Sequence, residues 1–295
     1  MINITVIGSG TMGNGIAHVF AQNNFKVTVV DVKTEALEKA KITITKNLDR
    51  QVAKGAIDET VKSNTLNNLT FIDNLAEGAK NADLVIEAAT ENVNIKLDIF
   101  RSLDAICKPE CILASNTSSI PITKIGAVTS RPEKVIGMHF MNPVPVMKLV
   151  EIIKGFKTSD EVADKIVALS KQIGKVPAVA NDMPGFIANR ILMPMINEAI
   201  ETLFQGIGGV VEIDTVMKLG MAHPMGPLQL ADFIGLDVCL AICNVLYEGF
   251  GNPKYAPCPL LVNMVTSGSL GVKSGSGFYD YSAGGKELVV ASQFK

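Results

Sequence analysis

The sequence lacks the features of several broad protein classes. Its 27 basic residues are balanced by 29 acidic residues, which gives a formal net charge of −2. Without a surplus of Lys and Arg, the chain lacks the electrostatic footprint of nucleic-acid-binding proteins. No uncharged apolar run reaches the roughly 20 residues that cross a bilayer, and no basic leader precedes the apolar segment that begins at Ile2. We therefore expect a cytoplasmic protein with neither a nucleic-acid nor a membrane partner.

Cysteine and histidine are also scarce. The five cysteines are an odd number, which fits a reducing compartment. Cys107 and Cys111 lie four residues apart, as do Cys239 and Cys243, but no second CxxC pair or nearby histidine completes a metal site. We expect no metal and interpret these cysteines as small buried residues.

The 295 residues, 47% of them hydrophobic, are enough for two domains with large cores. Strand and helix patterns alternate as far as Met183, and from there only long apolar-periodic helices follow until the last residues. This predicts an α/β fold: a Rossmann-type domain with a largely parallel sheet (1–183), then an all-α C-terminal domain (184–295). The expected strands are 2–7, 26–30, 69–72, 83–88, 111–115, 135–138, 148–153 and 175–180.

The second domain is predicted to contain helices at 184–205, 212–219, 228–247 and 259–267. Asp182 is a suitable N-cap for the first of these, and Pro184 suits its first turn. Pro194 should kink the same helix.

A glycine-rich loop follows the first strand and opens a helix. In Gly8-Ser9-Gly10-Thr11-Met12-Gly13, the first glycine allows a tight turn, the second lets a pyrophosphate approach the backbone, and the third allows close helix packing. The unpaired N–H groups at the helix start suit the anion. The second strand ends at Asp31, where an acid can bind ribose hydroxyls and repel a 2′-phosphate. Together these features predict an NAD site.

Polar residues follow two later strands at the edge where such sheets bind ligands. Glu91 and Lys96 come after strand 83–88, although either is also an ordinary charge near a helix start. Asn116, Thr117, Ser118 and Ser119 follow strand 111–115. Such a run either caps a helix or binds a ligand, and we expect ligand binding for at least one serine.

A lone histidine and a lone glutamate stand in the segment 135–153. His139 follows strand 135–138, and Glu151 belongs to strand 148–153. If the strands lie side by side, the carboxylate can hold one ring nitrogen while the other faces a cleft, which makes a general base with its orienting partner. A core histidine beside an edge-strand glutamate is the alternative that these residues leave open.

Six segments, in order, resemble those of one family. They are GSGTMGNGIA (8–17), ASNTSS (114–119), GMHFMNPVPVMKLVEI (137–152), DMPGFIANR (182–190), HPMGPLQLADFIGLD (223–237) and GVKSGSGFYDY (271–281). Over essentially the whole chain the sequence resembles the L-3-hydroxyacyl-CoA dehydrogenases, particularly the short bacterial 3-hydroxybutyryl-CoA dehydrogenases.

This resemblance assigns roles to individual residues. It implies that His139 is the general base, that Glu151 orients it, and that Ser118 and Asn189 hold the reacting oxygen or carbonyl of the substrate. Asn189 lies in the second domain, so the resemblance implies an active site between the domains. His18 and His223 are then structural.

The resemblance also implies binding residues for NAD and for coenzyme A. The NAD contacts would come from Asp31, Glu91, Lys96, Ser118, Asn142 and Lys273, with Asn116 beside them, and the glycine loop adds Gly8, Gly10, Thr11, Met12 and Gly13. Arg50 and Lys54, four apart on one helical face, would meet the coenzyme A phosphates, and Ser119 would lie near the substrate. Family members commonly carry lysine at both of the former positions, so Arg50 is a departure that changes donor geometry. A tail after Tyr281 is longer than expected and is interpreted as an exposed extension.

The predicted activity is therefore the reversible NAD(H)-dependent oxidation of short-chain 3-hydroxyacyl-CoA, in fatty acid or butanoate metabolism. One alternative is a dehydrogenase of the same build acting on a free or carboxylated 3-hydroxy acid. Another is a non-catalytic NAD-binding protein, which would need a broken Ser118, His139, Glu151 or Asn189. The stretch 233–247 holds only one charge, Asp237, and an all-round apolar helix is buried or covered by another subunit. With the family's habit, this predicts a homodimer through the C-terminal domain, with further assembly open.

Overall fold

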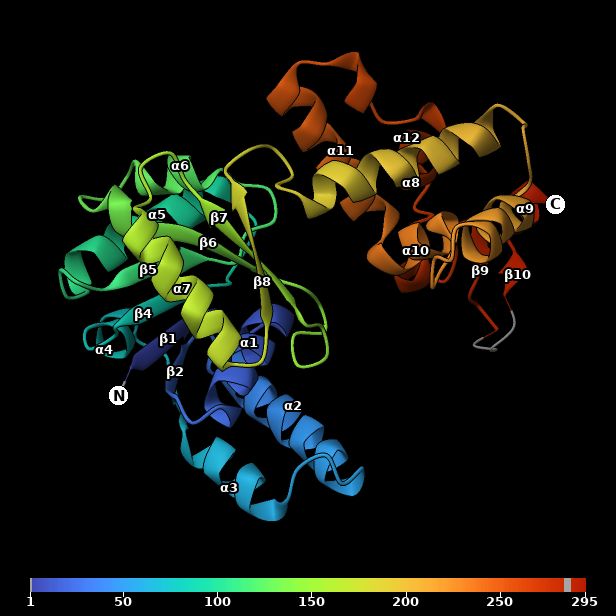
Figure 1. The fold of residues 1–295 in the computed structure, drawn as a ribbon. Coiled ribbons are helices and arrows are strands. Elements are labelled where there is room, and N and C mark those ends of the chain that lie inside the picture. Colours follow the sequence, from blue (N-terminus) through green and yellow to red (C-terminus); the bar gives the residue numbers. More distant parts are fainter. Residues whose placement is uncertain (1, 284–287) are drawn as a thin grey trace. The chain divides into compact units, whose positions relative to one another are not determined.

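The computed structural model describes residues 2–283 and 288–295. It divides into two compact units, the residues up to Met183 and Pro184–Lys295 (Figure 1). The first unit is an eight-stranded sheet with helices between its strands, and the second is mainly helical.

The sheet of the first unit has the strand order β3-β2-β1-β4-β5-β6-β7-β8. All neighbouring strands run parallel except β6 and β7, which form an antiparallel pair. The expected largely parallel sheet is therefore confirmed. The strands are β1 (Asn3–Ile7), β2 (Lys26–Val30), β3 (Leu69–Ile72), β4 (Leu84–Glu87), β5 (Ile112–Ser115), β6 (Val135–Phe140), β7 (Leu149–Lys154) and β8 (Val176–Asn181).

Helices connect most of these strands. Several begin at a side-chain cap: the Asn92 side chain accepts from the Ile95 N–H, and Ser159 accepts from the Val162 N–H. The two five-residue helices, α4 and α6, are too short to give a helical repeat in the sequence, and they were not predicted. The helices are α1 (Thr11–Gln22), α2 (Thr34–Ala53), α3 (Glu59–Asn67), α4 (Leu75–Ala79), α5 (Val93–Ile106), α6 (Ile122–Gly126) and α7 (Asp160–Gln172).

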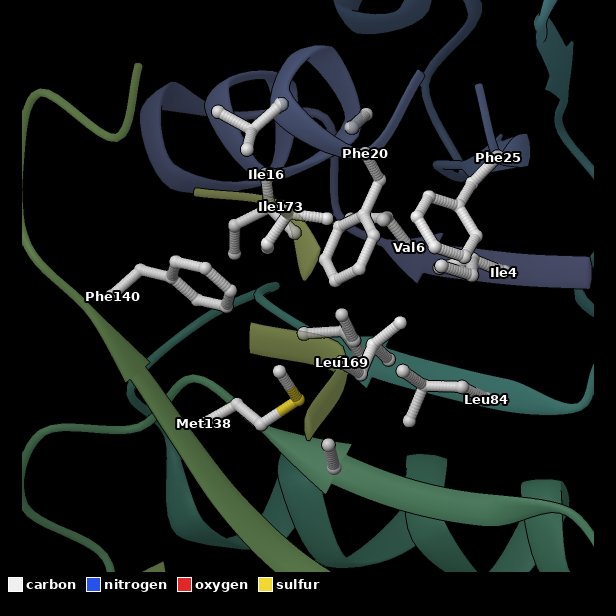
Figure 2. Packing of buried hydrophobic residues seen from close by; sticks show 14 of the residues in the cluster. Ile4, Val6, Ile16, Phe20, Phe25, Leu84, Met138, Phe140, Leu169 and Ile173 are labelled. Carbon is white, nitrogen blue, oxygen red and sulfur yellow. The ribbon is translucent and has the colours of Figure 1, made fainter. Parts of the chain in front are cut away.

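One hydrophobic cluster of the first unit fills a face of the sheet beneath α1 and α7. Figure 2 shows Met138 and Phe140 of β6 pointing into a cluster with Phe20 of α1 and Leu169 of α7. The Phe20 and Phe140 rings meet edge to face with centroids 6.4 Å apart. Because side chains alternate along a strand, this packing turns His139 to the opposite face.

The second unit has a separate core. Its elements are α8 (Ala188–Phe204), α9 (Val210–Thr215), the π-helical segment η2 (Val216–Gly220), α10 (Pro227–Ile234), α11 (Leu236–Phe250), α12 (Pro259–Thr266), β9 (Tyr279–Asp280), β10 (Val289–Val290) and the 3₁₀ turns η3 (Pro253–Tyr255), η4 (Val272–Ser274) and η5 (Ser292–Phe294).

The prediction that the first of these helices begins at Pro184 was wrong. Helix α8 begins at Ala188, because Gly185 (φ +75°) and Phe186 (φ +49°) adopt left-handed backbone conformations that end any helical run. The Asp182 carboxylate does not cap this helix: it accepts from the Thr123 N–H at 2.7 Å. Pro194 lies inside α8, as expected.

The single helix predicted for 228–247 is two helices. Gly235 has φ +100°, a backbone conformation that residues other than glycine rarely adopt. Helices α10 and α11 meet at this residue at an angle of 98°. Helix α11 is also not buried on every side: Cys239 and Leu246 are buried, whereas Tyr247 is 41% exposed. Among the described residues no single helix is long and apolar enough to span a membrane, and α10 and α11 reach the criterion only as a bent pair.

The tail after Tyr281 is not simply an exposed extension. Val289 and Val290 pair antiparallel with Asp280 and Tyr279. Beyond them, the Phe294 ring packs on the fully buried Phe278, with centroids 5.6 Å apart. The part of the tail at 284–287 lies outside the described residues.

Candidate active site

The glycine loop leaves space for an anion at the start of α1. A Cβ on Gly13 would lie 1.8 Å from the Gly8 carbonyl oxygen, so Gly13 permits the close packing of helix and loop. A Cβ on Gly10, by contrast, would meet nothing within 4 Å, and no side chain caps α1 at this residue. The start of α1 is therefore open at Gly10, which fits the approach of a pyrophosphate to the backbone there.

Asp31 stands directly after β2 and is bonded to the same loop. One carboxylate oxygen accepts from the Ser9 N–H at 2.8 Å and from its hydroxyl at 2.7 Å. Burial raises the pKa of Asp31, but the hydrogen bonds from Ser9 and Lys33 outweigh it and leave the pKa below its ordinary value. An ionised carboxylate at this position has the chemistry to accept hydrogen bonds from ribose hydroxyls and would repel a 2′-phosphate.

His139 and Glu151 stand opposite each other in the antiparallel pair β6 and β7. The His139 Nδ1 and a Glu151 carboxylate oxygen are 2.8 Å apart. Both residues are buried, at 9% and 1% exposure. They lie within the strands, since β6 extends to Phe140 and β7 to Lys154, so the sequence expectation placed His139 too near a strand end. The expected contact is present, and the pair can act as a base with an orienting carboxylate.

Side chains along β6 and β7 point alternately to the two faces of the sheet, and this places His139 and Glu151 on the face opposite the cluster of Figure 2. Val150 and Ile152 flank Glu151 and belong to the same hydrophobic cluster as Met138 and Phe140. On the other face, Gly137 leaves no space for a side chain, because a Cβ there would lie 2.8 Å from Ile153. The register of β6 on β7 therefore turns the acid and the base together toward the second face.

The Glu91 carboxylate accepts several hydrogen bonds from the polar turn that follows β5. Its Oε1 accepts from the Thr117 hydroxyl at 2.5 Å, from the N–H groups of Ser118 (3.0 Å) and Ser119 (3.1 Å), and from the Ser119 hydroxyl at 2.7 Å. Burial raises the pKa of Glu91, but the bond from Thr117, the charge of Lys96 and the serine donors together lower it below the ordinary value. Two predicted site residues, Glu91 and Ser118, are therefore brought together.

Lys96 is buried beside a carboxylate that the sequence analysis did not single out. Glu87 ends β4 with no exposed surface, and its oxygens lie 2.5 and 2.7 Å from the Lys96 Nζ. The Ser115 hydroxyl donates to Glu87 at 2.7 Å, and the Ala89 N–H donates at 2.9 Å. A polar residue at the end of an otherwise apolar parallel strand was the available signal.

Asn116 connects the ends of three strands. Its N–H donates to the Glu87 carbonyl of β4 at 2.7 Å, and its side-chain oxygen accepts from the Phe140 N–H of β6 at 2.9 Å. This residue therefore links the Glu87 network to the strand that carries His139.

A cavity of about 410 Å³ lies beside the glycine loop. The loop supplies Ser9, Gly10 and Thr11, helix α2 supplies Lys39, Thr43 and Asn47, and the β6–β7 connection supplies Asn142 and its neighbours. The lining positions of α2 continue toward Arg50 and Lys54 at the spacing of one helical face, and Arg50 donates to Asn47 at 3.3 Å. Arg50 and Lys54 are both exposed.

The remaining predicted residues belong to the second unit. Asn189, in the first turn of α8, is 8% exposed. Lys273 forms an ion pair with Asp237, and the two side chains are 46% and 40% exposed. Their roles stay predictions.

The other histidines have surroundings of their own. His18 is fully buried with its Nε2 at 3.3 Å from the Gln51 amide, and burial lowers its pKa to about 4. The His223 N–H donates to the Met217 carbonyl. Within the residues that the structure describes, no group of three or more metal-binding side chains occurs.

Comparisons with known proteins agree with this arrangement. Residues 3–183 match the family model of the NAD-binding domain of 3-hydroxyacyl-CoA dehydrogenase, and residues 185–281 match the model of its C-terminal domain. A probable 3-hydroxybutyryl-CoA dehydrogenase of Bacillus subtilis is 54% identical over 94% of this chain and 96% of its own length. A 3-hydroxybutyryl-CoA dehydrogenase of Clostridioides difficile is 50% identical, covering 95% of this chain and all of its own length (100%).

The fold is likewise that of solved relatives. The crystal structure of (S)-3-hydroxybutyryl-CoA dehydrogenase from Ralstonia eutropha superposes with a TM-score of 0.93 at 48% identity, covering 95% of this chain and 98% of that one. With both domain models matched and the cofactor loop formed, the chain belongs to the 3-hydroxyacyl-CoA dehydrogenase family and is an NAD-dependent dehydrogenase.

Proposed function

We propose that the protein catalyses the reversible NAD(H)-dependent oxidation of (S)-3-hydroxybutyryl-CoA, or a similarly short 3-hydroxyacyl-CoA, to the 3-ketoacyl-CoA. The observation that carries the proposal is the buried contact of 2.8 Å between His139 Nδ1 and Glu151. The names of the relatives in Bacillus subtilis and Clostridioides difficile support this substrate.

In this mechanism His139 takes the proton of the 3-hydroxyl group through its Nε2, since Glu151 occupies the Nδ1 side. The carboxylate of Glu151 selects the tautomer and stabilises the imidazolium that forms. NAD⁺, when bound, supplies the acceptor for the hydride from C3. In the reverse direction protonated His139 gives its proton to the 3-keto oxygen.

Ser118 and Asn189 hold the reacting oxygen or carbonyl in this proposal. Ser118 is suited to this by the turn in which it lies, because Glu91 fixes its N–H at 3.0 Å. Asn189 contributes its amide from the start of α8. Positioned polar groups of this kind restrict the substrate to geometries close to the transition state.

We place the cofactor at the glycine loop, with Asp31, Glu91, Lys96, Asn142 and Lys273 as its proposed contacts. Coenzyme A would follow the face of α2 toward Arg50 and Lys54. The 410 Å³ cavity and the exposed cations beyond it support that path, since cations on a helix face suit phosphates.

We also propose a homodimer through the helical unit. Leu219 is 81% exposed, Ile191 66% and Val216 58%. A cavity of about 450 Å³ is lined by residues of α8, α9 and η2, most of them apolar. Because exposed apolar areas mark interaction sites, these residues support association together with the stretch 233–247, in which Phe233 is 55% exposed. Light scattering that gave a monomer at micromolar concentration would contradict it.

The activity is tested by the loss of NADH absorbance with acetoacetyl-CoA, measured in parallel with NADPH and with free acetoacetate. We expect fast turnover with NADH and the thioester only. Turnover with free acetoacetate but not with its thioester would keep the hydride chemistry and reject the coenzyme A site. Absence of turnover with every pair would reject the proposed reaction.

A further inference from the structure

At the end of β4 one buried ammonium group lies between two carboxylates. Lys96 Nζ lies 2.5 Å from a Glu87 oxygen and 3.7 Å from a Glu91 oxygen. Lys96 is 2% exposed and Glu87 has no exposed surface, whereas the Glu91 side chain is 43% exposed. The three residues thus form a chain that runs from a fully buried carboxylate, through a buried ammonium, to a carboxylate at the surface.

The outer end of this chain holds the Ser118 turn. Both N–H groups of Ser118 and Ser119 donate to the Oε1 of Glu91, whose Oε2 faces Lys96. Moving the Glu91 carboxylate would therefore change the direction of the Ser118 side chain.

Stability alone does not explain the inner end of the chain. A buried ion pair is weak evidence for stability, because the cost of desolvating two charges offsets their attraction. Glu87 accepts from Lys96, from Ser115 and from the Ala89 N–H. Ser115 lies just before the polar turn, and Ala89 and Lys96 lie on either side of Glu91 in the sequence, so these contacts connect Glu87 with the residues that flank the turn.

We propose that Glu87 is a positioning residue for the reaction: it fixes Lys96, which holds Glu91 in place, and Glu91 in turn sets the position of Ser118. The inference rests on the proposed function, in which Ser118 contacts the substrate. Glu87 itself contacts neither substrate nor cofactor.

The test is a double-mutant cycle between Glu87→Gln and Glu91→Gln, with kcat and KM measured for acetoacetyl-CoA and NADH. We expect Glu87→Gln to lower kcat about 10- to 100-fold, because small displacements of positioning groups have effects of this size. The KM for acetoacetyl-CoA should change less than threefold. In the Glu91→Gln background the same substitution should have almost no further effect, since the two residues act in one chain.

A matched control lies at the other end of the same strand. Asp83 precedes β4 and pairs with Lys108 at 2.7 Å, with each side chain about one third exposed. Asp83→Asn removes a carboxylate of an ion pair without touching the turn, so its kcat should equal that of the wild type. Equal losses in Glu87→Gln and Asp83→Asn would show a general effect on the fold and overturn the proposal.

Amide hydrogen exchange at Ser118 and Ser119 supplies a readout that does not need turnover. Glu87→Gln should accelerate exchange at both amides, because their acceptor, the Glu91 carboxylate, is less firmly held. If this variant does not fold, the double variant Glu87→Gln with Lys96→Met removes the buried pair as a unit and should accelerate exchange in the same way. Unchanged exchange or additive losses of kcat would overturn the proposal. Accelerated exchange in a chain whose wild type does not turn over acetoacetyl-CoA would reject the proposed reaction and keep the role of Glu87 in the turn.

Discussion

The two units satisfy their buried carboxylates in different ways. In the first unit Glu87 faces the Lys96 ammonium and Glu151 faces the His139 ring. In the second unit the hydrogen bonds to Asp214 and Asp232 come from backbone N–H groups and tyrosine hydroxyls. A carboxylate beside a cation or a titratable ring can take part in chemistry, whereas one surrounded by neutral donors connects segments of the chain.

The connecting role is clear at Asp214. This residue of α9 accepts from the N–H groups of Leu228 and Gln229, the first turn of α10, and therefore caps that helix from a distance. The Tyr279 hydroxyl donates to the same carboxylate at 2.8 Å. Asp214 thus joins α9, α10 and β9.

The largest effect is expected from breaking the His139–Glu151 pair of the first unit. His139→Gln should lower kcat by on the order of 10²–10⁴, because it replaces a positioned base with an amide that does not take up a proton near neutral pH. NADH affinity, measured by the fluorescence of the bound dinucleotide, should change little. A folded variant with near-normal kcat would contradict the assignment, and Glu151→Gln should show a loss in the same direction.

The next effect belongs to the second unit and should appear in stability. Asp214→Ala leaves three donors without an acceptor, so the free energy of unfolding should fall by about 2–4 kcal/mol. Urea denaturation measures it. Tyr279→Phe, which removes one of the three donors and leaves the carboxylate, should cost about 1 kcal/mol. Equal costs for the two variants would deny Asp214 its role as a cap.

Asp232 should give the second unit an unusual pH dependence. Burial raises its pKa to about 6, and the bonds from Tyr279, Phe278 and Tyr281 only partly offset this. Because the folded pKa lies above the unfolded value of 3.8, the stabilisation is present below pH 3.8 and is lost as the pH rises through 6. The full loss is about 3 kcal/mol, from 1.36 kcal/mol per pKa unit.

The measurement is urea denaturation of the wild type and of Asp232→Asn between pH 4 and pH 7.5. The difference in unfolding free energy should shift in favour of the variant as the pH rises. Glu91 has the opposite sign: its lowered pKa contributes stability above pH 4.5, which is lost as the pH falls further. A difference between wild type and Asp232→Asn that does not change with pH would contradict the prediction.

The smallest effect concerns the choice of cofactor. Asp31→Ala removes the charge that repels a 2′-phosphate, so the ratio of kcat/KM for NADPH to that for NADH should rise about tenfold, the equivalent of 1.4 kcal/mol. A ratio equal to that of the wild type would mean that Asp31 does not set the preference.

Elements with a strong local pattern were predictable from the sequence. Strands such as Lys26–Val30 and Leu69–Ile72 have the expected bounds, because their apolar runs end at turn residues. The contact of His139 with Glu151 followed from two adjacent strands. Local signals failed where the tertiary structure decides: Gly235 divides an apolar run that reads as one helix, and Phe186 adopts a left-handed conformation that its sequence does not announce.

The buried polar network was the least predictable part of the site. Lys96 reads as an ordinary charge near a helix start, and only the packing of α5 against the sheet buries it beside Glu87. Asp214 and Asp232 are distant in the sequence from their partners Tyr279 and Tyr281. Such long-range pairs leave no periodicity that a sequence reading can detect.

Because His139 and Glu151 meet only in the correct antiparallel register of β6 and β7, catalytic activity also depends on the correct pairing of these strands. A shift of one residue would turn Glu151 into the packed face and leave His139 opposite an aliphatic neighbour. In a refolded preparation, molecules with a shifted register would therefore be inactive and not merely slower in turnover. The number of active sites, titrated against protein concentration, would count the correctly paired fraction.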